Sequence, residues 1–152
     1  NRKKDTADGW VNIDFDFSCE PDLVWDIKDG IPFKNDSVDE FYLSHVVEHL
    51  TIEQITCLMR EIWRTGKNGA TVKIIVPHWN YEVAWSHDHR SVPGVPKFFD
   101  IWQPGFAAVQ NYYKWTFGFM FFKIKEIIED TAGNVNPEPQ IYFTLEIDKN
   151  AT

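Results

Sequence analysis

Alternating apolar and polar residues predict the first strand of this chain. From Trp10 to Phe17 the two kinds of residue follow one another with a period of two, which is typical of a strand with one buried and one polar face. The short apolar run at residues 23–26 is interpreted as a loop or a short extended piece. The β-branched and aromatic residues from Val38 to Ser44 predict a second, buried strand.

A helix is predicted directly after this second strand. Thr51 and Gln54 stand three residues apart, as in a capping box. The apolar residues that follow share one face at spacings of three and four: Ile52, Ile55, Met59, Ile62 and Trp63. Gly66 and Gly69 are expected to end the helix. A β-branched run at residues 70–77 then predicts a third strand, and the order strand, helix, strand predicts parallel pairing through a right-handed crossover.

The rest of the chain predicts a long loop and a closing hairpin. Residues 78–110 are irregular, rich in aromatic residues and interrupted by prolines, and are interpreted as a substrate loop or small subdomain. Residues 119–129 and 140–148 predict two strands. Their connector has no helical periodicity, so these strands must run antiparallel. The sequence therefore predicts one α/β domain over residues 1–152, with a mostly parallel sheet and a C-terminal antiparallel hairpin.

Composition excludes several classes of protein. The 152 residues carry 15 Lys and Arg against 23 Asp and Glu, a net charge of −8, which argues against a nucleic-acid partner bound through phosphates. The 43% hydrophobic and 16% aromatic content excludes intrinsic disorder. No apolar stretch approaches the roughly 20 residues of a membrane span, so no membrane partner is expected. Cys19 and Cys57 form no CxxC pair, which favours a reducing, cytoplasmic location.

Four local strings resemble those of class I S-adenosylmethionine-dependent methyltransferases, particularly the type 11-like subgroup. They occur in the usual order, at residues 9–14 (GWVNID), 31–40 (IPFKNDSVDE), 44–50 (SHVVEHL) and 66–70 (GKNGA). The resemblance implies a three-layer Rossmann-like fold that binds its cofactor at the carboxyl ends of the strands. It also implies methyl transfer from S-adenosylmethionine, with S-adenosylhomocysteine as product. The acceptor is expected to be a small molecule or a glycan, and a homo-oligomer is possible.

The resemblance also assigns residues to the nucleoside part of the cofactor. Asp14, with Phe15 beside it, looks like the carboxylate that accepts both ribose hydroxyls, since an ionised carboxylate can accept two donors at once. Asp26 and Ile27 match the loop that flanks the adenine. The alternatives are that Asp14 is an ordinary turn residue and that Asp26 is surface charge.

Histidines near the second strand suggest further contacts. Ser44 and His45 match the strand end that passes under the methionine part of the cofactor. His45 and His49 stand four residues apart, a spacing that can hold zinc when further ligands exist. The HExxH motif is absent, however, and no metal is assigned.

The loop after the third strand supplies the candidate substrate residues. They are its histidines and their neighbours: His78, Trp79, His87, His89 and Arg90. The string from His87 to Arg90 allows three alternative roles for its histidines. One of them could brace Asp88, act as a general base or bind a metal. No catalytic residue is assigned, because positioning alone can supply much of the catalysis in methyl transfer.

One feature of the methyltransferase family is missing from the sequence. No strand with a glycine-rich loop precedes Trp10, so the fold is expected to be N-terminally incomplete. Two neighbouring strands would then keep unpaired backbone groups. The chain is either a fragment of a longer protein or a degenerate member whose sheet closes differently and which need not bind cofactor. The alternative functions are accordingly a non-catalytic interaction module with this fold, or a metal-dependent hydrolase built on His87 and His89.

Overall fold

The computed structural model describes residues 9–94, 98–100, 103, 120–131 and 138–151. Within these residues the strands are β1 (Ile13–Asp14), β2 (Leu23–Val24), β3 (Val38–Ser44), β4 (Gly66–Pro77), β5 (Phe121–Asp130) and β6 (Gln140–Asp148). One α-helix, α1 (Ile52–Thr65), lies between β3 and β4. Four short 3-10 helices complete this part of the chain: η1 (Phe17–Cys19), η2 (Ile27–Asp29), η3 (Val47–His49) and η4 (Glu82–Trp85).

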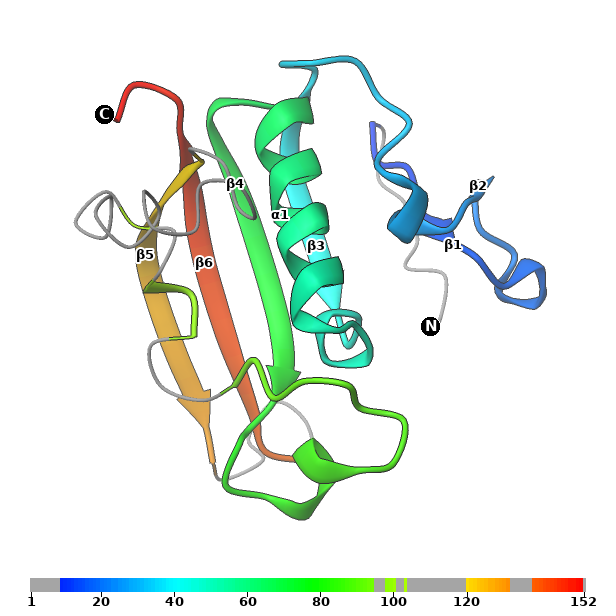
Figure 1. Ribbon diagram of the computed structural model, residues 1–152, viewed down its shortest axis with the longest axis vertical. Helices are drawn as coiled ribbons and strands as arrows, with labels where there is room; N and C mark the ends of the chain where they lie inside the picture. The colour runs from blue at the N-terminus through cyan, green and yellow to red at the C-terminus, as the bar shows by residue number, and fades with distance from the viewer. Residues whose placement is uncertain (1–8, 95–97, 101–102, 104–119, 132–137, 152) are drawn as a thin grey trace.

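A four-stranded sheet forms the centre of the molecule (Figure 1). Its strand order is β3-β4-β6-β5. The β3–β4 pair is parallel, as the strand, helix, strand order predicts, with Leu43 opposite Ile74. The β4–β6 and β5–β6 pairs are antiparallel, which confirms the predicted C-terminal hairpin. Its first strand begins at Phe121, and the predicted position 119 lies outside the described residues.

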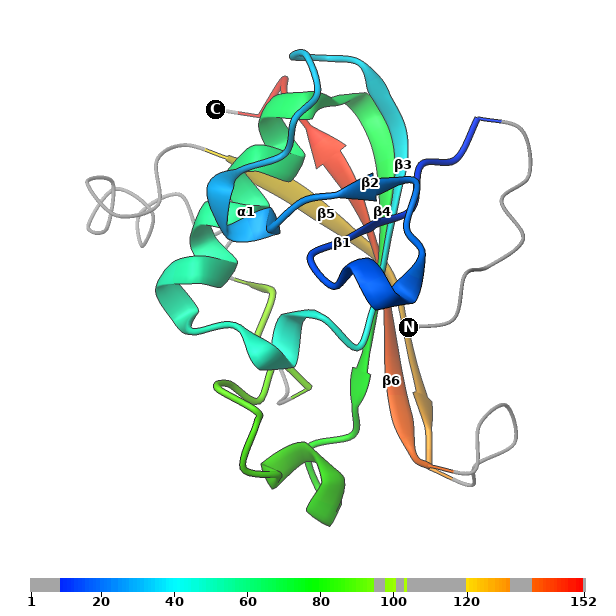
Figure 2. The same ribbon diagram turned by 90° about the vertical axis from the view of Figure 1, so that its right-hand side faces the viewer.

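Helix α1 covers one face of this sheet (Figure 2). The predicted capping box is present, because Thr51 Oγ1 accepts from the Gln54 N–H at 3.4 Å and Gln54 Oε1 accepts from the Thr51 N–H at 2.9 Å. The buried face of the helix includes Ile55, Met59 and Ile62. Ile52 was predicted on the same face but is 46% exposed, because it is the first residue of the helix.

Gly66 joins α1 directly to β4. A Cβ atom at this position would lie 2.2 Å from Ile147 Cδ1 and 2.9 Å from the Ile62 carbonyl oxygen. Only glycine therefore allows the end of α1 to pack this closely on the sheet.

The predicted strand at residues 10–17 is much shorter in the structure. Only Ile13–Asp14 form β1, paired in parallel with β2. Asp14 Oδ1 accepts from the Asp16 N–H at 2.9 Å, and Asp16 Oδ1 accepts from the Ser18 N–H at 2.8 Å. These side-chain bonds turn the backbone into η1, because they offer the chain a local alternative to a strand ladder. The predicted strand was therefore wrong both before Ile13 and beyond Asp14.

The small β1–β2 sheet is separate from the four-stranded sheet. It lies beyond the β3 edge in Figure 1, and in Figure 2, which is viewed from that side, it is drawn in front of β3 and β4. Among the described strands, β3 pairs with β4 alone.

The described helices are all too short or too polar to span a bilayer.

Candidate functional site

The paired strands β1 and β2 bring the two predicted nucleoside-binding acids to one place. Asp14 lies opposite Val24 in the parallel register. The Trp25 N–H donates to the Asp14 carbonyl oxygen at 2.9 Å, and Asp26 is the next residue. Both acids therefore stand at the carboxyl ends of adjacent parallel strands, the edge where open α/β sheets bind ligands.

Asp14 retains an oxygen that a ligand can use. Its Oδ1 accepts from the Asp16 N–H at 2.9 Å, and no described residue donates to Oδ2. The side chain is half-buried, whereas its neighbour Phe15 is 74% exposed. A half-buried carboxylate with one oxygen available beside an exposed aromatic ring is suited to accept hydroxyl donors from a ligand.

The carboxylate of Asp26 is already engaged by its own turn. Oδ1 accepts from the Lys28 N–H at 3.0 Å, and Oδ2 pairs with Lys28 Nζ at 2.9 Å. Burial raises the pKa of Asp26, but these bonds and the Lys28 charge outweigh it and hold the pKa below its ordinary value. A ligand amine would have to displace Lys28 to reach this carboxylate. Ile27 packs against the core from the same turn.

The end of β3 carries the second predicted contact region. Ser44 is the last residue of β3 and lies opposite Ile75 of β4. His45 follows with a positive φ of 53°, and its N–H still donates to the Ile75 carbonyl at 3.0 Å. The chain thus leaves the sheet abruptly at His45 and places the imidazole at the strand end.

Both ring nitrogens of His45 have protein partners. Nδ1 lies 3.1 Å from Glu48 Oε1, and Nε2 lies 2.8 Å from Gln140 Nε2. Tyr142 donates its hydroxyl to Gln140 Oε1 at 3.1 Å, which directs the Gln140 amide N–H toward His45. His45 Nδ1–H therefore donates to Glu48. The hydrogen bond to Glu48 raises the pKa of His45 above its ordinary value, although burial opposes the shift.

The first predicted substrate residue, His78, is buried and has protein partners on both ring nitrogens. It is 5% exposed, its Nδ1 accepts from the Asn80 N–H at 3.2 Å and its Nε2 lies 3.4 Å from Glu129 Oε2. Its ring stacks on Trp79 with centroids 5.9 Å apart. Trp79 is half-buried, and its carbonyl oxygen accepts from Trp85 Nε1 at 2.8 Å. These contacts brace the start of the loop.

The remaining loop residues separate into three different environments. His87 is exposed and has no hydrogen-bond or ion-pair partner among the described residues. The Arg90 N–H donates to the Glu48 carbonyl at 2.7 Å, so the backbone of Arg90 has a structural role. His89 lies against His49, with ring centroids 4.9 Å apart. The loop therefore brings His89 to η3 and leaves His87 outside.

Asp88 braces the loop, but through partners other than its neighbouring histidines. Ser86 Oγ donates to Asp88 Oδ1 at 2.5 Å. Asp88 Oδ2 lies 3.6 Å from Nδ1 of His49. The bond from Ser86 and the nearby histidines hold the pKa of Asp88 below its ordinary value.

Sequence reasoning missed the cluster that results from these contacts. Donor atoms of Glu48, His49 and His89 all lie within 4.8 Å of one another. The adjacent Glu48 and His49 were a usable signal, but His89 joins them from forty positions along the chain.

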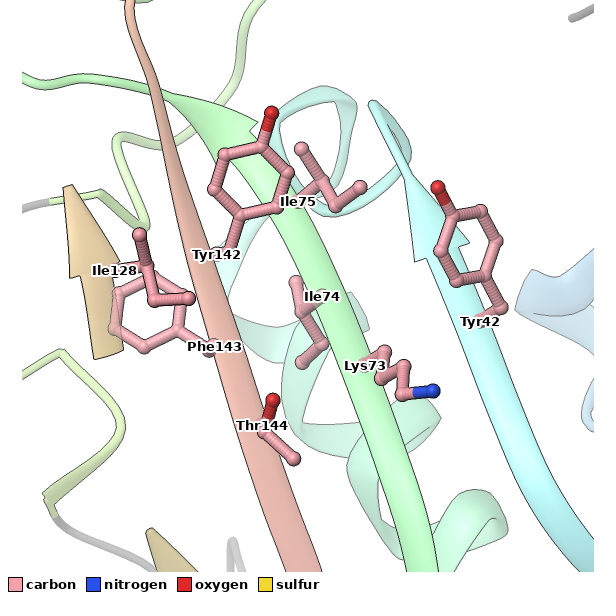
Figure 3. A pocket seen from close by; sticks show the side chains of 8 residues that line it. All are labelled: Tyr42, Lys73, Ile74, Ile75, Ile128, Tyr142, Phe143 and Thr144. Atoms are coloured by element: carbon pink, nitrogen blue, oxygen red, sulfur yellow. The ribbon is translucent and has the colours of Figure 1, made fainter. Parts of the chain in front are cut away.

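A separate pocket lies on the sheet face opposite α1 (Figure 3). No residue predicted to contact cofactor or substrate lines it. Its lining comes from the strands of the four-stranded sheet: Tyr42, Lys73, Ile74, Ile75, Ile128, Tyr142, Phe143 and Thr144.

Comparison with known proteins gives matches in structure but not in sequence. No family model and no curated protein matches the chain. The N-methyltransferase NodS from Bradyrhizobium japonicum WM9 is similar in structure, with a TM-score of 0.54 and 10% identity over 84% of this chain and 59% of NodS. A Sulfolobus solfataricus protein assigned to the type 11 methyltransferases has a TM-score of 0.54 and 13% identity over 92% of this chain and 71% of its own.

These structural matches confirm the fold predicted from the four sequence strings. The chain has the Rossmann-like α/β fold of class I S-adenosylmethionine-dependent methyltransferases. It spans less than two thirds of the NodS chain. At identities of 10% and 13% the matches establish the fold, and the activity has to be argued from the site.

Proposed function

We propose that this chain is part of an S-adenosylmethionine-dependent methyltransferase that acts on a small-molecule or glycan acceptor. The observation that carries the proposal is the Asp14 carboxylate, half-buried at the carboxyl end of β1 with Oδ2 available. Ligands bind at this edge in open α/β folds, and the fold is shared with methyltransferases.

The residues at the two strand ends fit different parts of the cofactor. Asp14 would accept the ribose hydroxyls, and Ile27 offers an apolar surface for the adenine. Ser44 and His45 would adjoin the methionine part, with the His45 ring held in place by Glu48 and Gln140. When bound, S-adenosylmethionine supplies a methyl group on a positively charged sulfur. The chain would then contribute by orienting the cofactor and the acceptor.

Exposed aromatic side chains after β4 support a flat acceptor with apolar faces. Trp85 is 65% exposed and Tyr81 is 37% exposed, and such rings stack on sugars and other flat groups. The net charge of −8 supports an acceptor of this kind over a nucleic acid. Both cysteines, Cys19 and Cys57, are free thiols, which supports a reducing, cytoplasmic setting.

Calorimetric titration with S-adenosylhomocysteine tests the proposal. Asp14→Asn retains an oxygen for the Asp16 N–H but loses the charged acceptor. Hydrogen bonds to a charged group contribute about 1.5–3 kcal/mol, so we expect affinity to fall at least about tenfold. The matched control is Asp16→Asn, which removes the same charge two residues away and keeps an oxygen for the Ser18 N–H. Its affinity should equal that of the wild type.

Two outcomes of this titration would contradict different parts of the proposal. Absence of binding by the wild-type chain would refute cofactor binding by this chain and favour a non-catalytic role. Equal affinity of the wild type and Asp14→Asn would remove Asp14 from the site while leaving cofactor binding intact.

A further inference from the structure

The cluster of Glu48, His49 and His89 has the donor set of a metal site. Glu48 and His49 belong to η3, and His89 comes from the loop after η4. One donor atom from each residue lies within 4.8 Å of the other two. Two backbone bonds hold the loop on η3, because the N–H groups of Arg90 and Ser91 donate to the Glu48 carbonyl at 2.7 and 3.2 Å. The cluster is thus fixed by main-chain contacts.

Glu48 is buried with half of its carboxylate unsatisfied. It is 1% exposed, and Oε1 accepts from His45 Nδ1 at 3.1 Å. Its Oε2 has no hydrogen-bond partner in the described part of the chain. A buried carboxylate oxygen without a partner is costly, because burial removes the water that would otherwise solvate it. A cation bound at Oε2 would remove this cost.

The Nδ1 contacts of the two histidines are those that metal-binding histidines commonly make. His89 Nδ1 lies 3.2 Å from the Ala84 carbonyl, and His49 Nδ1 lies 3.4 Å from the Asp88 carbonyl. A carbonyl oxygen can only accept, so each Nδ1 carries the proton. Each Nε2 then keeps its lone pair for a ligand. Metal-binding histidines commonly donate their second ring N–H to a carbonyl or carboxylate in this way.

We propose that Glu48 Oε2 and the Nε2 atoms of His49 and His89 bind one divalent transition-metal ion, Zn²⁺ in the first instance. Imidazole nitrogens with one carboxylate oxygen suit Zn²⁺ and its neighbours in the first transition row, whereas Mg²⁺ prefers oxygen ligands alone. Three protein ligands leave a coordination position open. Because Glu48 also holds His45 at the end of β3, this open position would lie close to the region proposed for the methionine part of the cofactor. The metal site does not depend on methyl transfer by the chain.

Metal binding by the whole chain tests this proposal directly. After removal of bound ions with EDTA, we would titrate Zn²⁺ against a competing chelator and record the visible absorption of the Co²⁺ form. We expect one ion per chain. Loss of an outer-shell partner alone weakens metal sites by roughly 10–100-fold, so His49→Ala and His89→Ala should each weaken Zn²⁺ by more than about tenfold.

His87→Ala is the matched control, because His87 belongs to the same loop but is exposed and outside the cluster. It should bind Zn²⁺ as the wild type does. Glu48→Gln should weaken binding while His87→Ala does not. If Glu48→Gln fails to fold by circular dichroism, the histidine variants decide the question, since their side chains are only partly buried or exposed.

Three results would overturn the proposal. They are the absence of stoichiometric Zn²⁺ binding by the wild type, wild-type affinity in His89→Ala, and equal weakening by His87→Ala. Titration with S-adenosylhomocysteine on the metal-free chain separates this proposal from the proposed function, because cofactor binding through Asp14 should persist without the ion.

Discussion

Replacement of Arg64 by lysine should destabilise the fold by about 2 kcal/mol. The Arg64 guanidinium makes five hydrogen bonds from the last turn of α1. Its Nε and Nη2 donate to the two Glu61 oxygens at 2.8 and 2.7 Å. Its Nη1 donates to the Phe33 carbonyl and Asn35 Oδ1 at 3.1 and 2.7 Å, and Nη2 also donates to the Ile31 carbonyl at 2.9 Å. These bonds fasten the loop before β3 to the helix.

The expected cost follows from the geometry of the two side chains. A lysine ammonium keeps the charge and three donors on one nitrogen, but it cannot reproduce the planar fork of the guanidinium. About three of the bonds should be lost, at roughly 0.5–1.5 kcal/mol each. Water can partly replace them, because the Arg64 side chain is 34% exposed. A loss of about 2 kcal/mol lowers the Tm of a domain of this size by about 4–8 °C.

Thermal unfolding followed by circular dichroism would measure this effect, with urea unfolding as a second determination of the free energy. The control is Arg60→Lys, one turn earlier on α1 and exposed, which should change the stability by less than about 0.5 kcal/mol. A Tm for Arg64→Lys within about 1 °C of both the wild type and the control would refute a stabilising role for the guanidinium hydrogen bonds.

Two further predictions concern the same helix. Thr51→Ala should lower the free energy of unfolding by about 1 kcal/mol, because it removes the hydroxyl that accepts from the Gln54 N–H. Thr51→Ser keeps that hydroxyl and should retain most of the lost stability in the same urea measurement. The bonds from Arg64 hold the pKa of Glu61 below its ordinary value of 4.5, against burial. A carboxylate whose pKa is lowered in the folded state stabilises the fold fully at a pH above its unfolded-state pKa. This stabilisation is lost as the pH falls through the folded-state pKa. The stability difference between the wild type and Glu61→Gln should therefore shrink below about pH 4.5, and a constant difference down to acid unfolding would contradict this.

The elements that the sequence predicted correctly depend on local signals. The capping box and the apolar spacing predict the start and the buried face of α1 within fifteen residues, and both signals can be read from residues close together in the sequence. The same applies to β3, whose β-branched and aromatic residues form a strand with the predicted bounds.

The first strand shows where a local pattern fails. Asp14 and Asp16 satisfy the alternation of a strand, but aspartate side chains also accept from backbone N–H groups two residues ahead. In a short edge segment this local bonding outweighs the strand ladder, so the chain turns at Asp16. The pattern of polarity cannot distinguish a solvated strand position from a turn-forming one.

The metal-binding cluster could not be predicted for a different reason. The pairing of His89 with His49 depends on backbone bonds from Arg90 and Ser91 to the Glu48 carbonyl, and these are tertiary contacts. Spacing along the chain favoured the pairs His87 with His89 and His45 with His49. In the structure, neither pair occurs together in the cluster. The adjacency of Glu48 and His49 is visible in the sequence, but the burial of Glu48 and its unsatisfied oxygen are known only from the structure.

The split between the two sheets links stability to the proposed function. The residues proposed to contact the nucleoside lie at the ends of β1 and β2 and in η2. Those proposed for the methionine part lie at the end of β3, and no pairing of described strands joins the two sheets. The loop at residues 30–37 connects the two sheets, and Arg64 and Glu61 fasten that loop to α1 through the Ile31 carbonyl and N–H. Because no pairing of described strands joins the two sheets, the relative position of Asp14 and His45 depends on these hydrogen bonds to Ile31. A binding site assembled from the edges of two separate sheets requires such a fixed connection, because a displacement of about 1 Å is enough to impair a site that works by positioning.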